Sequence, residues 1–509
     1  MAEDALYNWL QSRSTGVQLP ISSLPSFTGV GNFGSSAYRF VDFLKDSGMR
    51  VWQICPLGPT GYGDSPYQCF SAFAGNPYFI DLDPLESEGL LLSDERKSLQ
   101  ELSNEFVDYG SLYGSYWPLL TIAHQRFLAS GKDSVGIYGS IRQFREQQSS
   151  WIEDYALFMA LKSQYNGSCW LDWPTKYRNY NTAYNLERTQ ELEDAIDAQV
   201  FYQYLFYAQF ERLHTYCKLN GVKIMGDIPI FVSLDSSDVW SNRELFQLTI
   251  NGEPIAVAGV PPDYFSVDGQ LWGNPLYNWP AHINSNFSWW LERIGNNLSF
   301  YDIVRLDHFR GFESYWSVSA NESTARNGSW EKSPGIELFN AIHSKFPEAQ
   351  IIAENLGVIT EAVESLHLAT GFPGMAVLQF AFDENSSNAY LPHNHTVNSV
   401  VYTGTHDNDT TVGWFSSLHE SAKNQVRTYL KVTGETIAAD LVRCALSSVG
   451  RLAIVPVQDI MSLGTEARLN TPGAASGNWQ WRITNSQLEA LQLECAQYLR
   501  ELNMLSGRI

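Results

Sequence analysis

Short apolar runs alternate along this chain with segments of helical periodicity. The run VWQICPL (51–57) is continuously apolar, which is typical of a parallel strand buried on both faces. The segment before it places Phe40, Phe43 and Leu44 at helical spacing. The predicted strands are 18–22, 51–57, 222–232, 302–308, 350–355, 375–382, 400–407 and 452–459. Eight alternating β and α units predict an α/β fold, a (β/α)8 TIM barrel.

Such a barrel needs only about 250 residues, so the rest of the chain is expected in insertions. Residues 1–84 are interpreted as the first part of the barrel, with an active-site loop at 58–78. A mainly helical inserted subdomain is predicted over 85–200, where Ser150-Trp-Ile-Glu153 has the pattern of a capping box. Residues 201–509 are predicted to complete the catalytic barrel, with an irregular loop region at 233–290, a last helix near 486–503 and no C-terminal β-domain.

Four of the predicted strands end in acidic residues: Asp227, Asp307, Glu354 and Asp407. Because parallel barrel strands all point the same way, these four acids are expected to meet at one end of the barrel. Arg305 lies two residues before Asp307 and therefore on the same face of the strand, so we expect it to keep Asp307 ionised.

Glu354 ends an apolar strand, and burial there should raise its pKa enough for it to act as a general acid. Glycoside chemistry uses two neighbouring carboxyl groups, one protonated and one ionised.

Structural explanations compete with this interpretation. Arg305 and Asp307 could form a purely structural ion pair, and Asp227, before Ile-Pro, could be a turn or cap residue. The acids, together with His308 and His406, could bind a metal, but the HxH and HExxH spacings are absent. A metal site is therefore the less favoured interpretation of these acids.

Composition narrows the function further. The 509 residues include 33 Lys and Arg against 55 Asp and Glu, a net charge of −22, which argues against nucleic acid and anionic membranes as partners. The N-terminal segment has no signal-peptide pattern, and the six cysteines are scattered, so a cytoplasmic protein is expected. Aromatic residues make up 14% of the chain, which suits a ligand with apolar ring faces and many hydroxyls, such as a sugar chain.

Seven stretches resemble one known family. They are VWQICPLGPTGYGDSPYQ, GDIPIFV, GVPPDYFSVDGQLWGNP, VRLDHFRG, IIAENLG, YTGTHDNDT and PVQDIMSLGTEARLNTPG. Their sequences and order, from residue 13 to about 482, resemble the 4-α-glucanotransferases, also called amylomaltases or disproportionating enzymes, of glycoside hydrolase family 77.

The resemblance implies that neither a metal nor an organic cofactor is required, and it implies roles for individual residues. It implies Asp307 as nucleophile, Glu354 as general acid/base and Asp407 as transition-state stabiliser. The predicted substrate-binding residues are Tyr62, Asp64, Asp227, Asp263, Trp272, Asn274, Arg305, His308, His406 and Asn470. This chain departs from the family pattern at Asn355, where the family usually carries Asp, and the change removes a charge next to Glu354.

The expected reaction is a retaining double displacement that moves α-1,4-glucan segments from a maltooligosaccharide or glucan donor to the 4-hydroxyl of glucose or another glucan. Retention predicts that the carboxyl groups of Asp307 and Glu354 lie about 5–5.5 Å apart. A hydrolytic α-amylase-type enzyme and a catalytically silent glucan-binding protein remain as alternatives. The protein is expected to be a monomer or a weak homo-oligomer.

Overall fold

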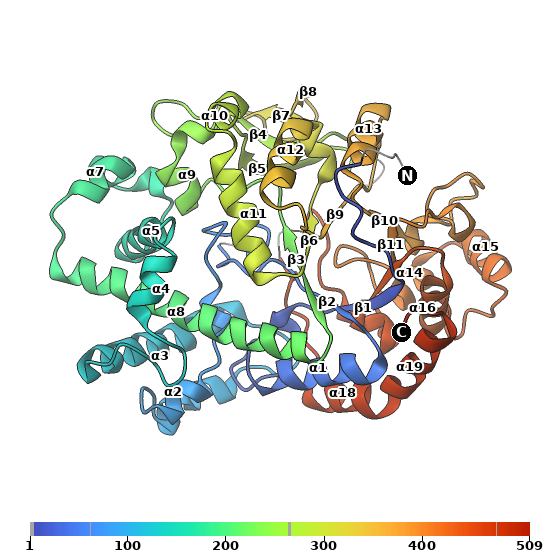
Figure 1. Cartoon of the computed structure of the whole chain (residues 1–509), viewed down its shortest axis with the longest axis horizontal. Helices are drawn as coiled ribbons and strands as arrows, with labels where there is room; N and C mark the ends of the chain where they lie inside the picture. Colours follow the sequence, from blue (N-terminus) through green and yellow to red (C-terminus); the bar gives the residue numbers. More distant parts are fainter. Residues whose placement is uncertain (1–4, 62, 263–265, 475) are drawn as a thin grey trace.

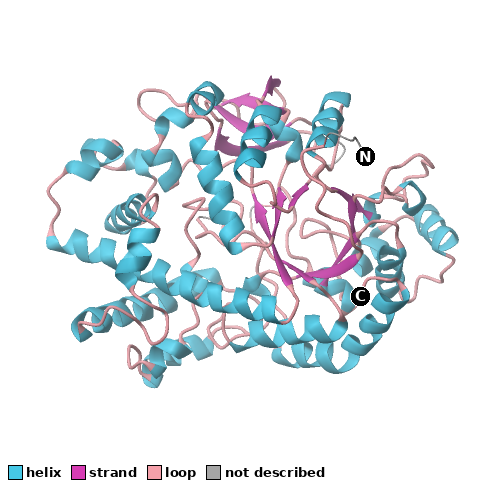
Figure 2. Cartoon of the chain, viewed as in Figure 1, coloured by secondary structure: helices cyan, strands magenta, loops and turns pink. Residues whose placement is uncertain are grey.

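The fold is built on one parallel sheet that curves into a barrel. The computed structural model describes residues 5–61, 63–262, 266–474 and 476–509. The eight strands of the parallel sheet are β1 (Ser14–Gln18), β2 (Val51–Gln53), β3 (Lys223–Ile228), β6 (Ile303–Leu306), β9 (Ile351–Ala353), β10 (Gly374–Val377), β11 (Ser399–Tyr402) and β12 (Leu452–Pro456). Figure 2 shows them as a ring of strands enclosed by helices.

Strand order is β10-β11-β12-β1-β2-β3-β6-β9, and every neighbouring pair is parallel. The two end strands also meet: the Ala353 N–H donates to the Pro373 carbonyl at 3.0 Å, and the Met375 N–H donates to Asn355 Oδ1 at 2.8 Å. These contacts bring β9 and β10 together. The predicted (β/α)8 barrel is therefore confirmed.

Helices surround the barrel and extend it on one side (Figure 1). The helices before β6 are α1 (Ser35–Ser47), α2 (Asp83–Ser87), α3 (Tyr109–Ser130), α4 (Ile141–Gln147), α5 (Ile152–Gln164), α6 (Thr175–Arg178), α7 (Tyr180–Asn185), α8 (Gln190–Leu219), α9 (Ser237–Ser241), α10 (Trp279–Asn284) and α11 (Ser288–Phe300). The helices after β6 are α12 (Gly335–Lys345), α13 (Glu361–Thr370), α14 (Thr411–Ser417), α15 (Glu420–Leu430), α16 (Ile437–Ser447), α17 (Val457–Ile460), α18 (Asn485–Ala490) and α19 (Ala496–Leu505). The interpretation of 85–200 as a separate subdomain stays a prediction.

A second, antiparallel sheet stands beside the mouth of the barrel. Its strands are β4 (Ala256–Val260), β5 (Gln270–Pro275), β7 (Ser314–Ser319) and β8 (Gly328–Lys332), in the order β5-β4-β7-β8. The prediction that 233–290 is irregular is therefore wrong, since this region contains β4, β5, α9 and α10. The sequence pattern did not predict this sheet, because β4 pairs with β7, which lies more than fifty residues further along the chain.

Two predicted strand ranges need correction. The first strand lies at Ser14–Gln18 rather than 18–22, because Pro20 has no N–H with which to extend the ladder. The strand predicted at 375–382 ends at Val377 and continues as a 3-10 turn over Leu378–Phe380. That turn is also apolar and largely buried, so the hydrophobic pattern cannot separate it from the strand.

The capping box predicted at Ser150–Glu153 is also wrong. Helix α5 begins at Ile152, its N-cap residue is Trp151, and no side chain caps it. Instead, the N–H groups of Trp151 and Ile152 donate to the Gln148 carbonyl at 3.2 and 3.0 Å. The end of α4 thus runs directly into α5, and backbone carbonyls satisfy the donors that a cap would serve.

Among the described residues, none of the helices combines the length and the apolar character that a membrane crossing requires.

Arg508 joins the C-terminal segment to the barrel. Its side chain is buried and donates to the carbonyls of Leu446 at 2.6 Å, Ser14 at 2.8 Å and Gly450 at 2.9 Å. Burial lowers the pKa of Arg508 to about 9, which still leaves the guanidinium charged at neutral pH. One buried cation therefore connects α16, β1 and the turn before β12.

We expect Arg508→Met to lower the free energy of unfolding by about 2–4 kcal/mol, because buried carbonyls would lose their donor. Denaturant unfolding followed by circular dichroism measures this difference. The control is Arg500→Met, at an exposed position of α19, which should change stability by less than about 0.5 kcal/mol. Equal losses in the two variants would contradict this account.

Candidate active site

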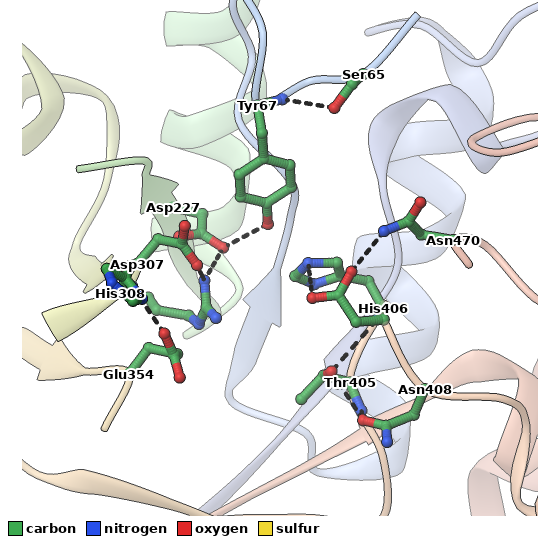
Figure 3. A network of polar contacts seen from close by, with 12 residues as sticks. Ser65, Tyr67, Asp227, Asp307, His308, Glu354, Thr405, His406, Asn408 and Asn470 are labelled. Atoms are coloured by element: carbon green, nitrogen blue, oxygen red, sulfur yellow. Dashed lines mark hydrogen bonds and ion pairs between the residues drawn. The ribbon is translucent and has the colours of Figure 1, made fainter. Parts of the chain in front are cut away.

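Four acids gather at the carboxyl ends of the barrel strands. Asp227 lies in the last part of β3, Asp307 directly follows β6, Glu354 directly follows β9, and Asp407 lies in the loop after β11. Figure 3 shows Asp227, Asp307 and Glu354 on one side of the site, His406 and Asn470 on the other, and Tyr67 between them. The structure thus brings together acids that are remote in sequence.

Arg305 connects two of these acids. Its Nη1 lies 2.6 Å from Asp227 Oδ2 and 3.0 Å from Asp307 Oδ1. Tyr67 adds a third contact, since its hydroxyl donates to Asp227 Oδ2 at 2.8 Å. The Asp227 side chain is only 1% exposed and that of Asp307 is 28% exposed. Of the two acids, Asp307 is therefore the one that a ligand can reach.

Glu354 is held by backbone donors. Its Oε2 accepts from the His308 N–H at 2.7 Å, and its Oε1 accepts from the Leu356 N–H at 2.9 Å. His308 has φ 51° and ψ 53°, in the left-handed region that is uncommon for a residue with a side chain. Backbone strain of this kind concentrates at functional sites, and here the strained residue donates to Glu354.

Burial raises the pKa of Glu354 to about 8; Arg305 opposes this shift and the charge of Asp307 adds to it. This confirms the expected direction. For Asp307, Arg305 lowers the pKa in the expected direction, but burial is the larger effect and Asp227 adds to it, so the net pKa is raised to about 6 rather than held down. Arg305 is shared between two carboxylates, so neither receives its full effect. At pH 7 Asp307 is still mainly ionised and Glu354 mainly protonated.

Asp407 occupies a different environment. His406 Nε2 lies 3.3 Å from its Oδ2, and Asn470 Nδ2 donates to its Oδ1 at 2.6 Å. Desolvation raises the pKa of Asp407, but His406, Asn470 and Arg305 outweigh it and bring the pKa well below the usual range. Its side chain is 46% exposed, so it is an anion that a sugar hydroxyl can reach.

Three aromatic rings line the same region. Tyr67 stacks on His406 with ring centroids 5.2 Å apart and 22° between the planes. Trp479 packs against both, at 5.8 Å from Tyr67 and 5.7 Å from His406. Trp479 has φ 63°, which is strained for so bulky a residue. Neither Tyr67 nor Trp479 was among the predicted site residues. Their positions in turn-rich, aromatic loops were the only sequence signal.

The other predicted binding residues differ in how close they lie to the acids. The Trp272 ring contacts the His308 ring edge-on at 4.9 Å, beside Glu354. Asn274 is buried and donates to the Val232 carbonyl at 2.9 Å, so it supports the loop after β3. Asp64 lines a neighbouring hollow with Tyr109 and Trp479. The predicted residues Tyr62 and Asp263 lie outside the described part of the chain.

His308 itself is neutral in this structure. Burial lowers its pKa to about 4, and the Arg310 charge acts in the same direction. Its Nε2 is buried without a hydrogen-bond partner among the described residues. Within that same part of the chain, no group of three or more His, Cys, Asp or Glu side chains is arranged to hold a metal ion.

The chain is similar along nearly its whole length to proteins of known activity. The family profile described as 4-alpha-glucanotransferase matches residues 19–488. The 4-alpha-glucanotransferase of Clostridium butyricum is 45% identical over 96% of this chain and 99% of that protein. That of Thermus thermophilus is 46% identical over 94% of this chain and 96% of that protein. Among solved structures, an amylomaltase from Streptococcus agalactiae in complex with acarbose superposes with a TM-score of 0.92 at 39% identity, covering 97% of this chain and 99% of that one.

The barrel, the acids at the carboxyl ends of its strands and these similarities together place the chain among the carbohydrate-active (β/α)8-barrel enzymes. The chain belongs to the 4-alpha-glucanotransferase family, and its activity is 4-alpha-glucanotransfer. Its substrates are accordingly glucans.

The two pKa values predict the pH dependence. A reaction that needs ionised Asp307 and protonated Glu354 has a bell-shaped pH profile of kcat/KM, with limbs near the two pKa values of about 6 and about 8. Glucose release from maltotriose measured from pH 4 to 10 tests this.

The Asp227→Asn variant tests whether Asp307 sets the acid limb of this profile. It removes a negative neighbour and leaves Arg305 to Asp307 alone, so the acid limb should move to lower pH. A limb that stays in place or moves to higher pH would show that Asp307 does not set it.

Proposed function

We propose that the glucan transfer proceeds by a double displacement in which Asp307 is the nucleophile, Glu354 the general acid and base, and Asp407 the stabiliser of the transition state. The observation that carries this proposal is the pair of unlike carboxyls at one barrel end, with Glu354 binding its proton more tightly than Asp307. In glycoside chemistry the protonated member serves as acid and the ionised member as nucleophile.

The first displacement forms an ester. An oxygen of Asp307 attacks the anomeric carbon of the donor glucose unit, and the bond from that carbon to the departing glucan oxygen breaks. Glu354 gives its proton to that oxygen. In the second displacement Glu354 takes the proton of an acceptor 4-hydroxyl, whose oxygen attacks the anomeric carbon and releases Asp307. Two inversions retain the configuration.

The hydrogen-bond pattern supports Asp307 as nucleophile over the other two aspartates. Both oxygens of Asp407 are engaged, one with His406 and one with Asn470. Arg305 and Tyr67 both contact Oδ2 of Asp227, and its Oδ1 is buried in a side chain that is only 1% exposed, so a sugar cannot reach it. In Asp307, Oδ1 contacts Arg305, while Oδ2 has no hydrogen-bond donor among the described residues. A carboxylate with one oxygen anchored and one available can reach a sugar carbon.

The substrate-binding residues are proposed on the same geometry. Asp407 and Asn470 present polar groups for sugar hydroxyls, and Tyr67, His406, Trp479 and Trp272 supply ring surfaces around them. Donors are proposed to be maltooligosaccharides or longer α-1,4-glucans, and acceptors glucose or another glucan. The acids and Arg305 supply the charges that the reaction needs, so no metal or cofactor is proposed.

Oligomeric state and compartment also belong to the proposal. We propose a monomer or weak homo-oligomer in a reducing compartment, the cytoplasm or a plastid stroma. All six cysteines are free thiols, which suits such a compartment. The net charge of −22 disfavours binding to nucleic acid or to anionic membranes.

Trapping the ester tests the assignment directly. In Glu354→Gln, α-maltosyl fluoride should still react, because fluoride departs without a proton, but the ester should then persist. Mass spectrometry of peptides should find the maltosyl group on Asp307. A label on Asp227 or Asp407 would overturn the assignment. Asp307→Asn should lower kcat by at least about 10⁴-fold and take up no label.

Trp272→Ala should raise the ratio of hydrolysis to transfer, because the ring beside His308 would no longer help to exclude water and hold the acceptor. Chromatography of the maltotriose products separates the two reactions, since transfer gives longer oligomers along with glucose. The matched control is Trp330→Ala, on β8 of the antiparallel sheet, which should leave the ratio unchanged. Similar ratios in the two variants would remove Trp272 from this role.

A further inference from the structure

Gln18 contacts His406, a residue of the candidate active site. It is the last residue of β1, its side chain is buried, and its Nε2 lies 3.2 Å from Nδ1 of His406. The other ring nitrogen of His406, Nε2, faces Asp407 Oδ2 at 3.3 Å. His406 is therefore held between an amide on one side and a carboxylate on the other.

This arrangement fixes which nitrogen of His406 carries hydrogen. A carboxylate accepts hydrogen bonds and does not donate them, so Nε2 of His406 must bear the hydrogen that points at Asp407. When Nδ1 accepts a hydrogen bond from the Gln18 NH₂ group, the ring is the neutral Nε2–H tautomer. Gln18 thus completes the contact that orients His406 toward Asp407.

A side-chain amide can serve both protonation states of an imidazole. Turned by half a rotation about its last bond, Gln18 would present Oε1 to Nδ1 and accept a hydrogen bond from the imidazolium. As it stands, Gln18 Oε1 is buried and has no hydrogen-bond partner among the described residues. A partner for it exists as soon as Nδ1 of His406 gains a proton.

Several charged groups surround His406. They are Asp407 on its own loop, Arg305 on β6, Asp227 on β3, Asp307 after β6 and the Tyr67 hydroxyl in the loop after β2. Burial lowers the pKa of His406, but Asp407 outweighs this effect and the net shift is upward. The upward shift favours the imidazolium, so the ring needs a partner at Nδ1 in its charged form as well as in its neutral form.

We propose that Gln18 is a positioning residue of this enzyme, whose amide holds the His406 ring with Nε2–H toward Asp407 and turns to keep that geometry when Nδ1 is protonated. Asp407 then remains ionised and aimed at the sugar in both states. The importance of this for catalysis rests on the role proposed above for Asp407.

Two variants of Gln18 should shift the pKa of His406 in opposite directions. Gln18→Leu leaves the imidazolium Nδ1–H unpaired and should lower the pKa, whereas Gln18→Glu offers only acceptor oxygens and a negative charge and should raise it. Each shift should be about one unit or more. NMR titration of the full-length protein with ¹⁵N-labelled histidine measures both the pKa and the tautomer, and the signal missing from His406→Gln identifies the residue.

Gln53 provides the matched control. It pairs with Gln18 in the β1–β2 register, is equally buried, and accepts from the Tyr402 hydroxyl at 2.9 Å. Gln53→Leu should move the pKa of His406 by less than about 0.3 unit. The proposal is overturned if the His406 titration is the same in wild type, Gln18→Leu and Gln18→Glu, or if Gln53→Leu shifts it as much as Gln18→Leu does.

Kinetic constants of the Gln18 variants test whether the position of His406 matters for the reaction. Gln18→Leu should lower kcat by about 10–100-fold with KM for maltotriose within about threefold, because a slightly misplaced stabiliser affects the transition state more than substrate binding. Gln18→Glu, which keeps a partner for the ring, should retain more activity than Gln18→Leu. Shifted His406 titrations with unchanged kcat would show that Gln18 controls the ring without affecting the reaction, and would overturn its role as a positioning residue.

Discussion

The active site depends on one buried cation shared by two carboxylates. Arg305 on β6 lies directly opposite Asp227 on β3 in the sheet register, and Asp307 follows two residues later on the same face. Ions buried in this way are costly unless each is paired with good geometry. Here the 2.6 and 3.0 Å contacts satisfy that condition, and they require β3 and β6 to be neighbours in this register. The barrel thus has to form correctly before the site can exist.

The shared arginine also explains the electrostatic asymmetry of the site. Because Asp227 takes part of the charge of Arg305, Asp307 keeps a moderately raised pKa. Glu354, which forms no ion pair with any described residue, has its pKa raised further. Asp407 lies with His406 and is fully ionised near neutral pH. Three carboxyls at one barrel end therefore hold their protons with three different strengths.

Tyr67 connects the two halves of this arrangement. Its hydroxyl donates to Asp227 on the Arg305 side, and its ring stacks on His406 on the Asp407 side. Trp479, on the loop after the last barrel strand, packs against Tyr67 and His406, while Tyr109 in the helical region donates to the Trp479 carbonyl at 3.1 Å. Segments that are more than 300 residues apart in the chain thus contact one another around the same acids. These contacts help to hold the irregular loops in place at the site.

The sequence by itself determined the barrel and the convergence of Asp227, Asp307 and Glu354, because buried parallel strands leave continuous apolar runs and strand ends share one edge. It also determined the direction of the Glu354 pKa shift, because burial at the end of an apolar strand is its largest cause. Only the tertiary structure decided the pKa of Asp307, the small antiparallel sheet, and the places of Tyr67, Trp479 and Gln18. Each of these depends on contacts between segments far apart in the chain, and local patterns of hydrophobicity and spacing carry no information about such contacts.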